Sequence, residues 1–491
     1  MGVTVETSRQ QAVLDSVPTG LYIDGAWEAA SGGATLQVED PSTGEHLCQV
    51  ADATPEDGLR ALAAADRAQQ SWAGTRPQER ADILQRCYDA MMVRRDDLAL
   101  IITLEMGKPL AEAYAEVDYA AGFIRWFAGE AVRVAGRYST DPAGTGRILV
   151  SRQPVGPCVL VTPWNFPIAM GARKIAPALA AGCTTVIKPA QQTPLATLAL
   201  ASILEECGLP AGVLNVVTTR SAGRVVGALL ADRRTAKLSF TGSTEVGRGL
   251  LRAAADQVLR VSMELGGNAP FLVLRDADVE AAVEGAVVAK MRNMGQSCVA
   301  ANRFLVHESL AEEFSARLAQ RMAELTVGRG VDDGVQVGPL IDGRSRDGVA
   351  ELVADATDRG AVLATGGAPV GDRGYFYAPT VLTGVPGDAR LLREEIFGPV
   401  APVVAVGSDE EAVRLANETD YGLAAYVYTR DLRSALLVME RLRTGMVGIN
   451  QGMVSNPAAP FGGVKHSGLG REGGPEGIDE YLETKYAAIA I

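Results

Sequence analysis

The strongest constraint on the fold is a regular alternation of short apolar runs and helical runs between residues 155 and 263. The runs that predict strands are 155–161, 184–187, 214–217, 236–240 and 258–263, and those that predict helices are 167–181, 194–207, 221–231 and 244–255. Strands that alternate with helices in this way indicate a parallel, doubly wound sheet, which binds ligands at the carboxyl ends of its strands.

A second alternation follows a Gly266-Gly267-Asn268 break and runs from Phe271 to about residue 450, which predicts a second α/β domain. Before the first alternation, residues 54–130 show apolar spacings of three and four and predict three or four helices. Residues 137–153 differ from both regions and suggest a hairpin. A chain of 491 residues is long enough for two or three such domains.

Charge and composition exclude several classes of protein. A net charge of −13 and a pI near 5.0 argue against a nucleic-acid or anionic-membrane partner. No targeting segment is recognised and no apolar run approaches the about 18 residues that cross a bilayer, so we expect a cytoplasmic protein. Six dispersed cysteines without a CxxC pair predict reduced thiols, and with only three histidines we expect no metal site and a carboxylate as any catalytic base.

Cys298 is a candidate nucleophile. The spacing predicts a helix from Val279 to near Asn293 and a strand at 304–306, which places Cys298 on the connector between them. Gly295 loosens this connector, and a thiol on a loop over a rigid scaffold suits nucleophilic attack. The alternative is that Cys298 is a small buried hydrophobic residue, as most cysteines are.

Polar residues follow several predicted strands. Asn165, between two prolines, can donate its amide to a developing oxyanion or can cap the next helix. Lys188 can contact a ribose or phosphate, or can be a solvated loop lysine. Gly242 and Ser243 precede a helix whose main-chain amides form an anion site, although this turn is not a GxGxxG motif and also fits a plain capped helix.

Two carboxylates complete the set. Glu264 stands where an apolar strand ends, so burial would raise its pKa and suit it to act as a general base; the alternative is a salt bridge. Glu395 lies two residues before Phe397, a pair that can hold a sugar hydroxyl and a flat ring, or that forms a routine turn.

Taken together and in order, these runs resemble the aldehyde dehydrogenase superfamily over nearly the whole chain. The matching runs are 163–167 (PWNFP), 188–190 (KPA), 240–243 (FTGS), 263–267 (MELGG), 295–298 (GQSC) and 395–399 (EIFGP). The resemblance implies the fold of that superfamily, with two doubly wound α/β domains and a small β element for oligomerisation.

The resemblance also implies roles for the residues. Cys298 would attack the aldehyde to give a thiohemiacetal, Asn165 and the N–H of Cys298 would stabilise the oxyanion, and Glu264 would activate the water that hydrolyses the later thioester. The implied contacts of the nicotinamide cofactor are Trp164 (outer face), Lys188 (adenosine ribose), Gly242 and Ser243 (pyrophosphate), Leu265, Glu395 (nicotinamide ribose) and Phe397 (ring).

Cofactor choice rests on one departure from the family pattern. Many relatives that prefer NAD carry a glutamate three residues after the lysine, where it would repel a 2′-phosphate. This chain has Gln191 there, and Lys188 can neutralise the phosphate. We therefore expect that NADP is accepted and preferred over NAD.

The substrate is inferred from a finer resemblance, in runs 261–271, 290–293 and 461–472, to succinate-semialdehyde dehydrogenases. By motif, Arg173, Arg292 and Ser467 would hold the carboxylate of the substrate, although each also fits a structural salt bridge or turn contact. Glutarate semialdehyde or a broader range of aldehydes is the alternative, because one methylene is worth only about 1–3 kcal/mol. Ala300 replaces the second cysteine of some relatives, so we expect no disulfide switch at this loop.

The expected domains follow from the same resemblance. Residues 1–136, taken as helical, and 155–266 would form the cofactor-binding domain, 267–466 the catalytic domain, and the hairpin 137–154 with the tail 467–491 the oligomerisation element. The apolar end of the tail predicts pairing with another subunit in a homodimer or homotetramer. A more distant alternative is an inactive dinucleotide-binding relative, against which the joint presence of Cys298, Glu264 and Asn165 speaks.

Overall fold

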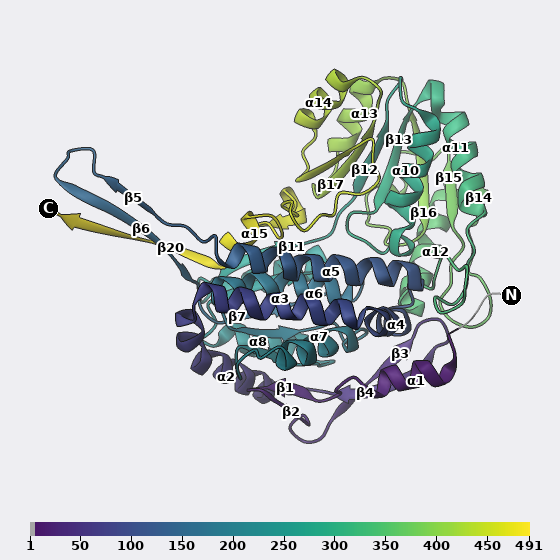
Figure 1. The fold of residues 1–491 in the computed structure, drawn as a ribbon. Helices are drawn as coiled ribbons and strands as arrows, with labels where there is room; N and C mark the ends of the chain where they lie inside the picture. Colours follow the sequence, from purple (N-terminus) through teal and green to yellow (C-terminus); the bar gives the residue numbers. More distant parts are fainter. Residues whose placement is uncertain (1–4) are drawn as a thin grey trace.

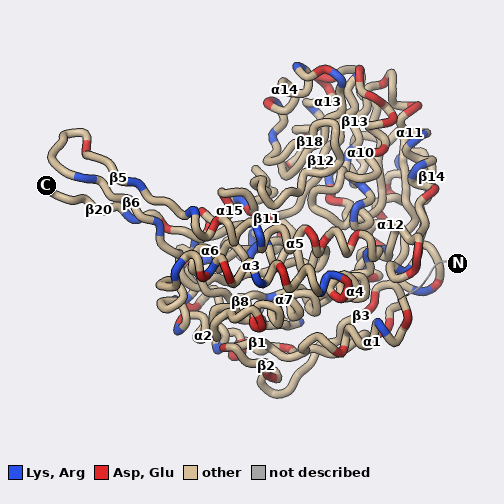
Figure 2. The backbone as a smooth tube through the Cα atoms, viewed as in Figure 1, with Lys and Arg blue, Asp and Glu red and all other residues tan. Residues whose placement is uncertain are grey.

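The structure, a computed structural model, describes residues 5–491. Figure 1 shows two α/β bodies, one above the other, and a narrow three-stranded sheet that projects to one side. The lower body contains the first sheet and most of the N-terminal half of the chain, and the upper body contains the second sheet. Acidic and basic residues are interspersed along both bodies (Figure 2). Within the described residues, no helix is long and apolar enough to cross a membrane.

The first sheet has eight strands, and its five central strands are the parallel ones that the sequence predicts. In spatial order the strands are β19 (Gly468–Leu469), β11 (Arg260–Glu264), β10 (Lys237–Thr241), β7 (Cys158–Val161), β8 (Thr185–Lys188), β9 (Leu214–Val216), β1 (Leu21–Ile23) and β2 (Ala26–Glu28). The predicted strands are confirmed to within a few residues. The antiparallel strands β1 and β2, of three residues each, were not predicted, and neither was a separate two-stranded sheet of β3 (Thr35–Asp40) and β4 (Glu45–Ala51).

Helices cover both faces of this sheet. One face carries α2 (Pro55–Gly74), α8 (Ala222–Ala231) and α9 (Thr244–Ala255), and the other carries α6 (Pro167–Ala181) and α7 (Leu195–Glu206). Three more helices pack over α6 and α7: α3 (Pro77–Val93), α4 (Arg95–Met106) and α5 (Leu110–Ala131). The four helices α2 to α5 confirm the predicted helical region, and a short α1 (Thr7–Asp15) precedes them.

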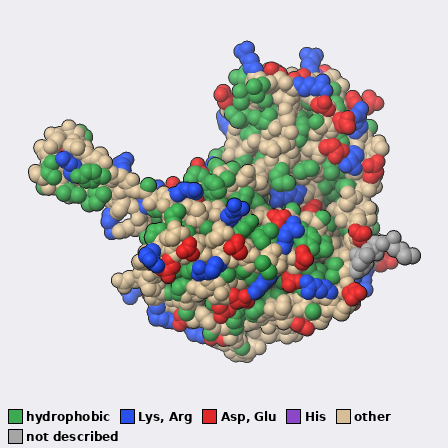
Figure 3. All heavy atoms as spheres, in the orientation of Figure 1, with side chains coloured by type: hydrophobic (Ala, Val, Ile, Leu, Met, Phe, Trp, Pro, Cys, Tyr) green, Lys and Arg blue, Asp and Glu red, His purple; other side chains and the backbone are tan. Residues whose placement is uncertain are grey.

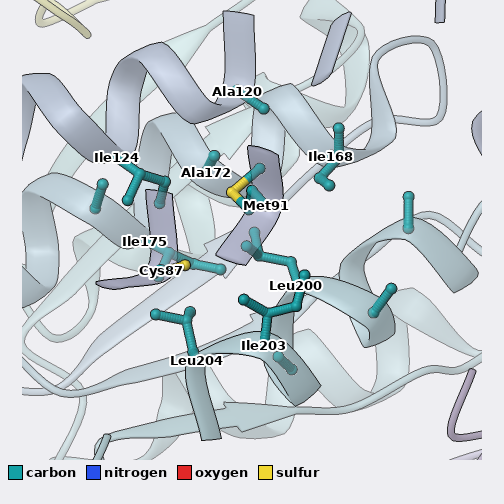
Figure 4. Packing of buried hydrophobic residues seen from close by; sticks show 14 of the residues in the cluster. Cys87, Met91, Ala120, Ile124, Ile168, Ala172, Ile175, Leu200, Ile203 and Leu204 are labelled. Atoms are coloured by element: carbon teal, nitrogen blue, oxygen red, sulfur yellow. The ribbon is translucent and has the colours of Figure 1, made fainter. Parts of the chain in front are cut away.

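The core beneath α6 is closely packed. Figure 4 shows side chains of α3, α5, α6 and α7 interdigitating, among them Cys87, Met91, Ile124, Ile175 and Leu204. All five are at most 1% exposed. A core packed at this density is hard to compress, so a side chain in it can move only if its neighbours move too. Helix α6 is therefore held on a fixed base, and so is the turn that precedes it.

The second sheet has seven strands and forms the upper body. In spatial order they are β14 (Val362–Thr365), β15 (Thr380–Thr383), β16 (Val400–Val406), β13 (Ala301–His307), β12 (Ala269–Val273), β17 (Ala424–Tyr428) and β18 (Met446–Ile449), of which only β14 is antiparallel. Helices α10 (Val279–Met291), α11 (Glu308–Ala323), α12 (Gly343–Asp358), α13 (Asp409–Asn417) and α14 (Leu432–Arg441) accompany it. This confirms the predicted second alternation, the helix before Cys298 and the strand after it.

The projecting sheet consists of β5 (Arg137–Thr140), β6 (Gly146–Pro154) and β20 (Leu482–Ala490), in the order β20-β6-β5. The terminal strand β20 pairs with β6 of its own chain along its whole length, from Leu482 opposite Pro154 to Ala490 opposite Gly146. The other edge of β20 is an outer edge of this sheet, so the pairing of the tail with another subunit stays a prediction. A short helix, α15 (Glu476–Asp479), precedes β20, and apolar side chains gather on the projecting sheet (Figure 3).

Candidate active site

A cavity of about 270 Å³ lies where the two bodies meet, at the carboxyl ends of β7, β10 and β11. It contains most of the residues that the sequence singles out. Its lining includes Trp164, Asn165, Arg173, Gly242, Ser243, Glu264, Leu265, Arg292, Cys298, Glu395 and Phe397. The three remaining predicted residues, Lys188, Gln191 and Ser467, do not line it.

The loop before Cys298 has an unusual backbone. Asn293, Met294 and Gly295 have φ angles of 56°, 55° and 73°, in the left-handed region that non-glycine residues rarely adopt. A Cβ on Gly295 would lie 2.1 Å from the carbonyl oxygen of Gly398, so only glycine fits there. Backbone strain of this kind persists where surrounding contacts impose it, and it gathers at functional sites.

Cys298 lines the cavity and is partly buried. Burial raises the pKa of this thiol to about 12; Glu395 and Glu264 add to the shift and Arg173 opposes it. At neutral pH the resting site therefore holds a thiol, which must lose its proton before it can attack. Gly267 makes room for the loop, because a Cβ there would lie 2.2 Å from the carbonyl oxygen of Cys298.

Asn165 lies in the turn between β7 and α6. Its amide nitrogen donates to the main-chain oxygen of Gln296 at 3.0 Å, which joins this turn to the Cys298 loop. The helix-cap alternative for Asn165 is wrong, because α6 is capped by Phe166 with no side-chain hydrogen bond. The second N–H of the amide is available to an oxyanion.

Glu264 ends β11 and is 2% exposed. Neither carboxylate oxygen has a hydrogen-bond partner among the described residues, so the salt-bridge alternative is wrong. Burial raises the pKa of Glu264 well above its usual value; Glu472 adds to this, while Arg173 and Lys174 oppose it. A carboxyl group with a raised pKa can exchange protons near neutral pH, which is the property that a general base needs.

The residues assigned to the nicotinamide end come together from both bodies. The rings of Trp164 and Phe397 meet edge to face, with centroids 5.4 Å apart and planes at 85°. Glu395 accepts a hydrogen bond from the main-chain N–H of Gly267 at 3.0 Å, and burial raises its pKa to about 7. Leu265 lines the same wall of the cavity.

The residues assigned to the phosphates and adenosine lie at neighbouring strand ends. Ser243 caps α9, its hydroxyl accepting from the N–H of Val246 at 3.4 Å, so the capped-helix alternative holds for its side chain. Lys188 is 6% exposed, which rules out a solvated lysine, and no ion pair of its ammonium is found among the described residues. Gln191 is exposed and lines a separate hollow beside Gln192.

These features fit a dinucleotide cofactor. The main-chain amides at the start of the 12-residue helix α9 suit a pyrophosphate, and burial without a carboxylate partner lowers the pKa of Lys188 to about 8, as expected for a cation placed to meet a ligand. Trp164 and Phe397 offer flat apolar surfaces to a ring.

Two arginines lie in the same cavity. Arg173, on α6, is 1% exposed, forms an ion pair with Glu472 (Nε to Oε2, 2.5 Å) and lies over the ring of Phe461 at 4.2 Å. Its Nη2 has no hydrogen-bond partner among the described residues. Arg292 lies over the ring of Phe166 at 4.9 Å, and no carboxylate of the described chain lies within 4.0 Å of its guanidinium.

The assignment of Ser467 to the substrate needs correction. Its hydroxyl donates to the main-chain oxygen of Gly266 at 2.8 Å and accepts from the N–H of Gly422 at 2.9 Å, and the side chain is fully buried outside the cavity. The serine that stands beside an arginine is Ser455, whose hydroxyl accepts from Nη1 of Arg292 at 3.3 Å.

Sequence reasoning missed Ser455 together with other lining residues, namely Tyr119, Phe166, Met170, Val299 and Phe461. A usable signal for Ser455 was its place in the irregular segment that follows the carboxyl end of β18, where α/β folds bind ligands. The aromatic residues carry no comparable signal, because their spacing is that of ordinary core positions.

A family model described as the aldehyde dehydrogenase family matches residues 27–487 of this chain. The chain belongs to the aldehyde dehydrogenase family. It is 58% identical over 444 residues to a succinate-semialdehyde dehydrogenase of Paenarthrobacter nicotinovorans, covering 90% of this chain and 99% of that one. It is 48% identical to a glutarate-semialdehyde dehydrogenase of Pseudomonas aeruginosa, covering 95% of this chain and 97% of that one.

Among solved structures, this aldehyde dehydrogenase superposes on an Escherichia coli NADP-dependent enzyme with a TM-score of 0.96 and 46% identity, over 99% of this chain and 100% of that one. The superposition extends over both α/β bodies and the projecting sheet, and it confirms the expected fold class of the chain. It is an NAD(P)-dependent oxidoreductase by membership of this family.

Proposed function

We propose that this aldehyde dehydrogenase oxidises succinate semialdehyde to succinate, with NADP preferred and NAD accepted. The observation that carries the substrate class is Arg292, a guanidinium in the cavity of Cys298 that lacks a carboxylate partner among the described residues and stands beside the hydroxyl of Ser455. An arginine fork and a hydroxyl suit the two oxygens of a carboxylate. The similarity to succinate-semialdehyde dehydrogenase supports the same substrate.

In the proposed reaction, the sulfur of Cys298 attacks the aldehyde carbon, and the oxyanion receives hydrogen bonds from the amide of Asn165 and the N–H of Cys298. The bound nicotinamide supplies a hydride acceptor, so that the thiohemiacetal becomes a thioester. Glu264 then takes a proton from the water that attacks the thioester, and the thiol of Cys298 leaves as the acid forms.

For the cofactor, we infer that Lys188, Gln191, Gly242 and Ser243 hold the adenosine and phosphates, and that Trp164, Leu265, Glu395 and Phe397 hold the nicotinamide end. Gln191 supports NADP, because a neutral side chain in this place does not repel a 2′-phosphate and Lys188 can attract it.

We also propose that residues 1–136 with 155–266 bind the cofactor, that 267–466 carry the nucleophile, and that the projecting sheet joins copies of the chain into a homodimer or homotetramer. The uncovered side chains of Tyr138, Tyr486 and Ile489 on that sheet support an oligomer, since exposed apolar strands favour association. One refinement is that β19, from the tail, belongs to the first sheet.

The deciding measurement is kcat/KM for succinate semialdehyde, glutarate semialdehyde and butanal, each with NADP and with NAD. We expect succinate semialdehyde with NADP to be the best pair and butanal, which lacks the carboxylate, to be poor. A preference for glutarate semialdehyde would select the alternative substrate, equal rates for butanal would remove the carboxylate argument, and a higher kcat/KM with NAD would reject the NADP preference.

Cys298→Ala is the control for the chemistry. It should abolish turnover while leaving NADP affinity unchanged, because the thiol forms the covalent bond and does not hold the cofactor. Unchanged turnover would reject the mechanism. Inactivity of the unmodified protein with all aldehydes, with NADP still bound, would favour the inactive dinucleotide-binding alternative.

A further inference from the structure

A buried ion pair lies beside the oxyanion site and has no part in the reaction described above. Lys108 and Glu116 join through Nζ and Oε2 at 2.5 Å, and both side chains are fully buried. Lys108 stands in the connector between α4 and α5, and Glu116 lies on α5. Removing two charges from water costs several kcal/mol per ion, so a pair placed here calls for a role beyond filling space.

The two members of the pair hold the Asn165 turn from both sides. The ammonium of Lys108 donates to the main-chain oxygen of Asn165 at 2.9 Å and lies over the ring of Phe166 at 4.0 Å. The other carboxylate oxygen of Glu116 accepts from the N–H groups of Ile168 and Ala169, at 3.1 and 3.2 Å, in the first turn of α6. The turn is thus fixed both before and after Phe166.

The same main-chain oxygen also connects to the nucleophile loop. The side-chain amide of Asn293 donates to the oxygens of Asn165 and Gln296, each at 3.0 Å. Glu112, one helical turn before Glu116 on α5, accepts from the N–H of Asn293 at 2.6 Å. Helix α5 therefore anchors both walls of the oxyanion site, the Asn165 turn and the loop that leads to Cys298.

We propose that Lys108 is a positioning residue for the oxyanion site, where its ammonium, clamped by Glu116, holds the Asn165 main chain at the distance from the Cys298 loop that the reaction needs. This inference rests on the proposed role of Asn165. Lys108 itself does not line the cavity. A misplacement of a catalytic group by about 1 Å costs about 10²-fold in rate, so loosening this clamp should slow the chemical step.

The test is the double variant Lys108→Met with Glu116→Gln, which removes both charges of the pair and keeps an acceptor for α6. Glu112, which also interacts with Lys108, keeps the N–H of Asn293 and the charge of Arg292 as partners. The readout is the rate constant for NADPH formation in a single turnover, with enzyme in excess over aldehyde. The rate constant is normalised to the concentration of active sites, which is measured as the Cys298 thiol that iodoacetamide alkylates. We expect this rate constant to fall about 10- to 100-fold. NADP affinity, measured by quenching of protein fluorescence, should be unchanged.

The matched control is Lys237→Met with Glu480→Gln. Lys237 is also fully buried, with its ammonium 3.6 Å from Glu480 and 2.6 Å from the hydroxyl of Ser262, but it begins β10, at the end of the strand away from the cavity. This control should lower the melting temperature and leave the single-turnover rate constant unchanged. If Lys108→Met with Glu116→Gln does not fold, Glu116→Gln alone serves as the test, with a several-fold slower single turnover expected.

A rate constant within twofold of the unmodified protein, or an equal fall in the Lys237 control, would overturn the proposal and leave Lys108 with a purely structural role. Failure of the proposed function is distinguishable, because it would show as the absence of NADPH formation in the unmodified protein.

Discussion

The two ends of the active-site cavity are built differently. The adenosine and phosphate end draws on strand ends of the first sheet: Lys188 closes β8 just outside the cavity, Gly242 follows β10 and Leu265 follows β11. The aldehyde end takes Arg173 from α6 and Arg292 from the end of α10. Topology alone therefore places Lys188, Gly242 and Leu265 at one edge of the first sheet, whereas the nicotinamide end and the aldehyde end both depend on how the two bodies pack.

Their electrostatic states differ as well. At the aldehyde end Arg173 is already paired with Glu472, and Arg292 bonds Ser455. At the cofactor end, the ammonium of Lys188 has neither an ion pair nor a hydrogen bond to another described residue. Each end therefore keeps one cation without a carboxylate partner among the described residues, Arg292 beside a hydroxyl at the aldehyde end and Lys188 at the cofactor end.

The largest effect is expected from a substitution of Glu264, which tests whether this residue acts only in hydrolysis of the thioester. Glu264→Gln should lower kcat about 10²- to 10⁴-fold, since an amide cannot take a proton from water. The first turnover of NADPH should remain close to normal, as measured by stopped-flow absorbance. Equal loss in both phases would instead assign Glu264 to deprotonation of the Cys298 thiol.

The next test removes the free charge of the aldehyde end. Arg292→Ala should lower kcat/KM for succinate semialdehyde about 10²-fold, because breaking a buried charge pair costs about 2–5 kcal/mol. The rate with butanal should change little, which makes butanal the internal control. A similar loss for both aldehydes would mean that Arg292 supports the loop and does not bind the substrate.

The third test follows the ionisation of the Cys298 thiol as the pH rises. Because burial raises the pKa of Cys298 to about 12, the thiolate fraction should increase about tenfold per pH unit between pH 7 and pH 9. Alkylation by iodoacetamide without cofactor, corrected for the Cys298→Ala background, measures this slope. A plateau below pH 9 would show that the thiol is activated in the resting site.

At the cofactor end, Gln191→Glu should lower kcat/KM with NADP about tenfold and spare NAD, because a charge repulsion near a protein surface is worth about 1–4 kcal/mol. Gln192→Glu is the matched control, since Gln192 lines the same hollow one residue further along. Equal effects of the two substitutions would mean that the overall charge of the hollow, and not the position of Gln191, decides between the cofactors.

The smallest expected effect distinguishes two serines. Ser455→Ala should raise KM for succinate semialdehyde about threefold to tenfold through the loss of one hydrogen bond, and leave the free energy of unfolding nearly unchanged. Ser467→Ala should do the reverse, because it leaves the buried oxygen of Gly266 without its donor at a cost of about 1–3 kcal/mol. Urea denaturation and steady-state kinetics separate the two outcomes.

The difference between the ends also explains how far the sequence could be interpreted. The strands, helices and strand-end residues of the first sheet follow from local periodicity and from the rule that ligands lie at carboxyl ends, so Glu264 and Gly242 were found by position. Ser467 was chosen by motif and proved to be a structural contact. Ser455 was missed because its place beside Arg292 is set by the packing of a distant loop, which periodicity does not encode.

The strands β1 and β2 were missed for a similar reason. Tyr22 of β1 lies opposite Val216 of the distant β9, and three-residue strands carry too little alternation to be recognised. The strands β3 and β4 have six and seven residues and pair with each other, and the alternation of buried and exposed positions in β3 was a usable signal that sequence reasoning passed over. The left-handed run at Asn293, Met294 and Gly295 was only partly anticipated, since Gly295 pointed to an irregular loop but the two preceding residues gave no sign of it.

The ion pairs of Glu472 with Arg173 and Lys174 have a consequence for biosynthesis. A ribosome releases the five parallel strands of the first sheet, α6 and the nucleophile loop well before it reaches the tail that carries Glu472. Until then two cations of α6 lack their counter-charge beside Glu264. The nascent enzyme therefore acquires its finished site only after Glu472 has been translated, and a product terminated before that residue would carry the thiol without these ion pairs.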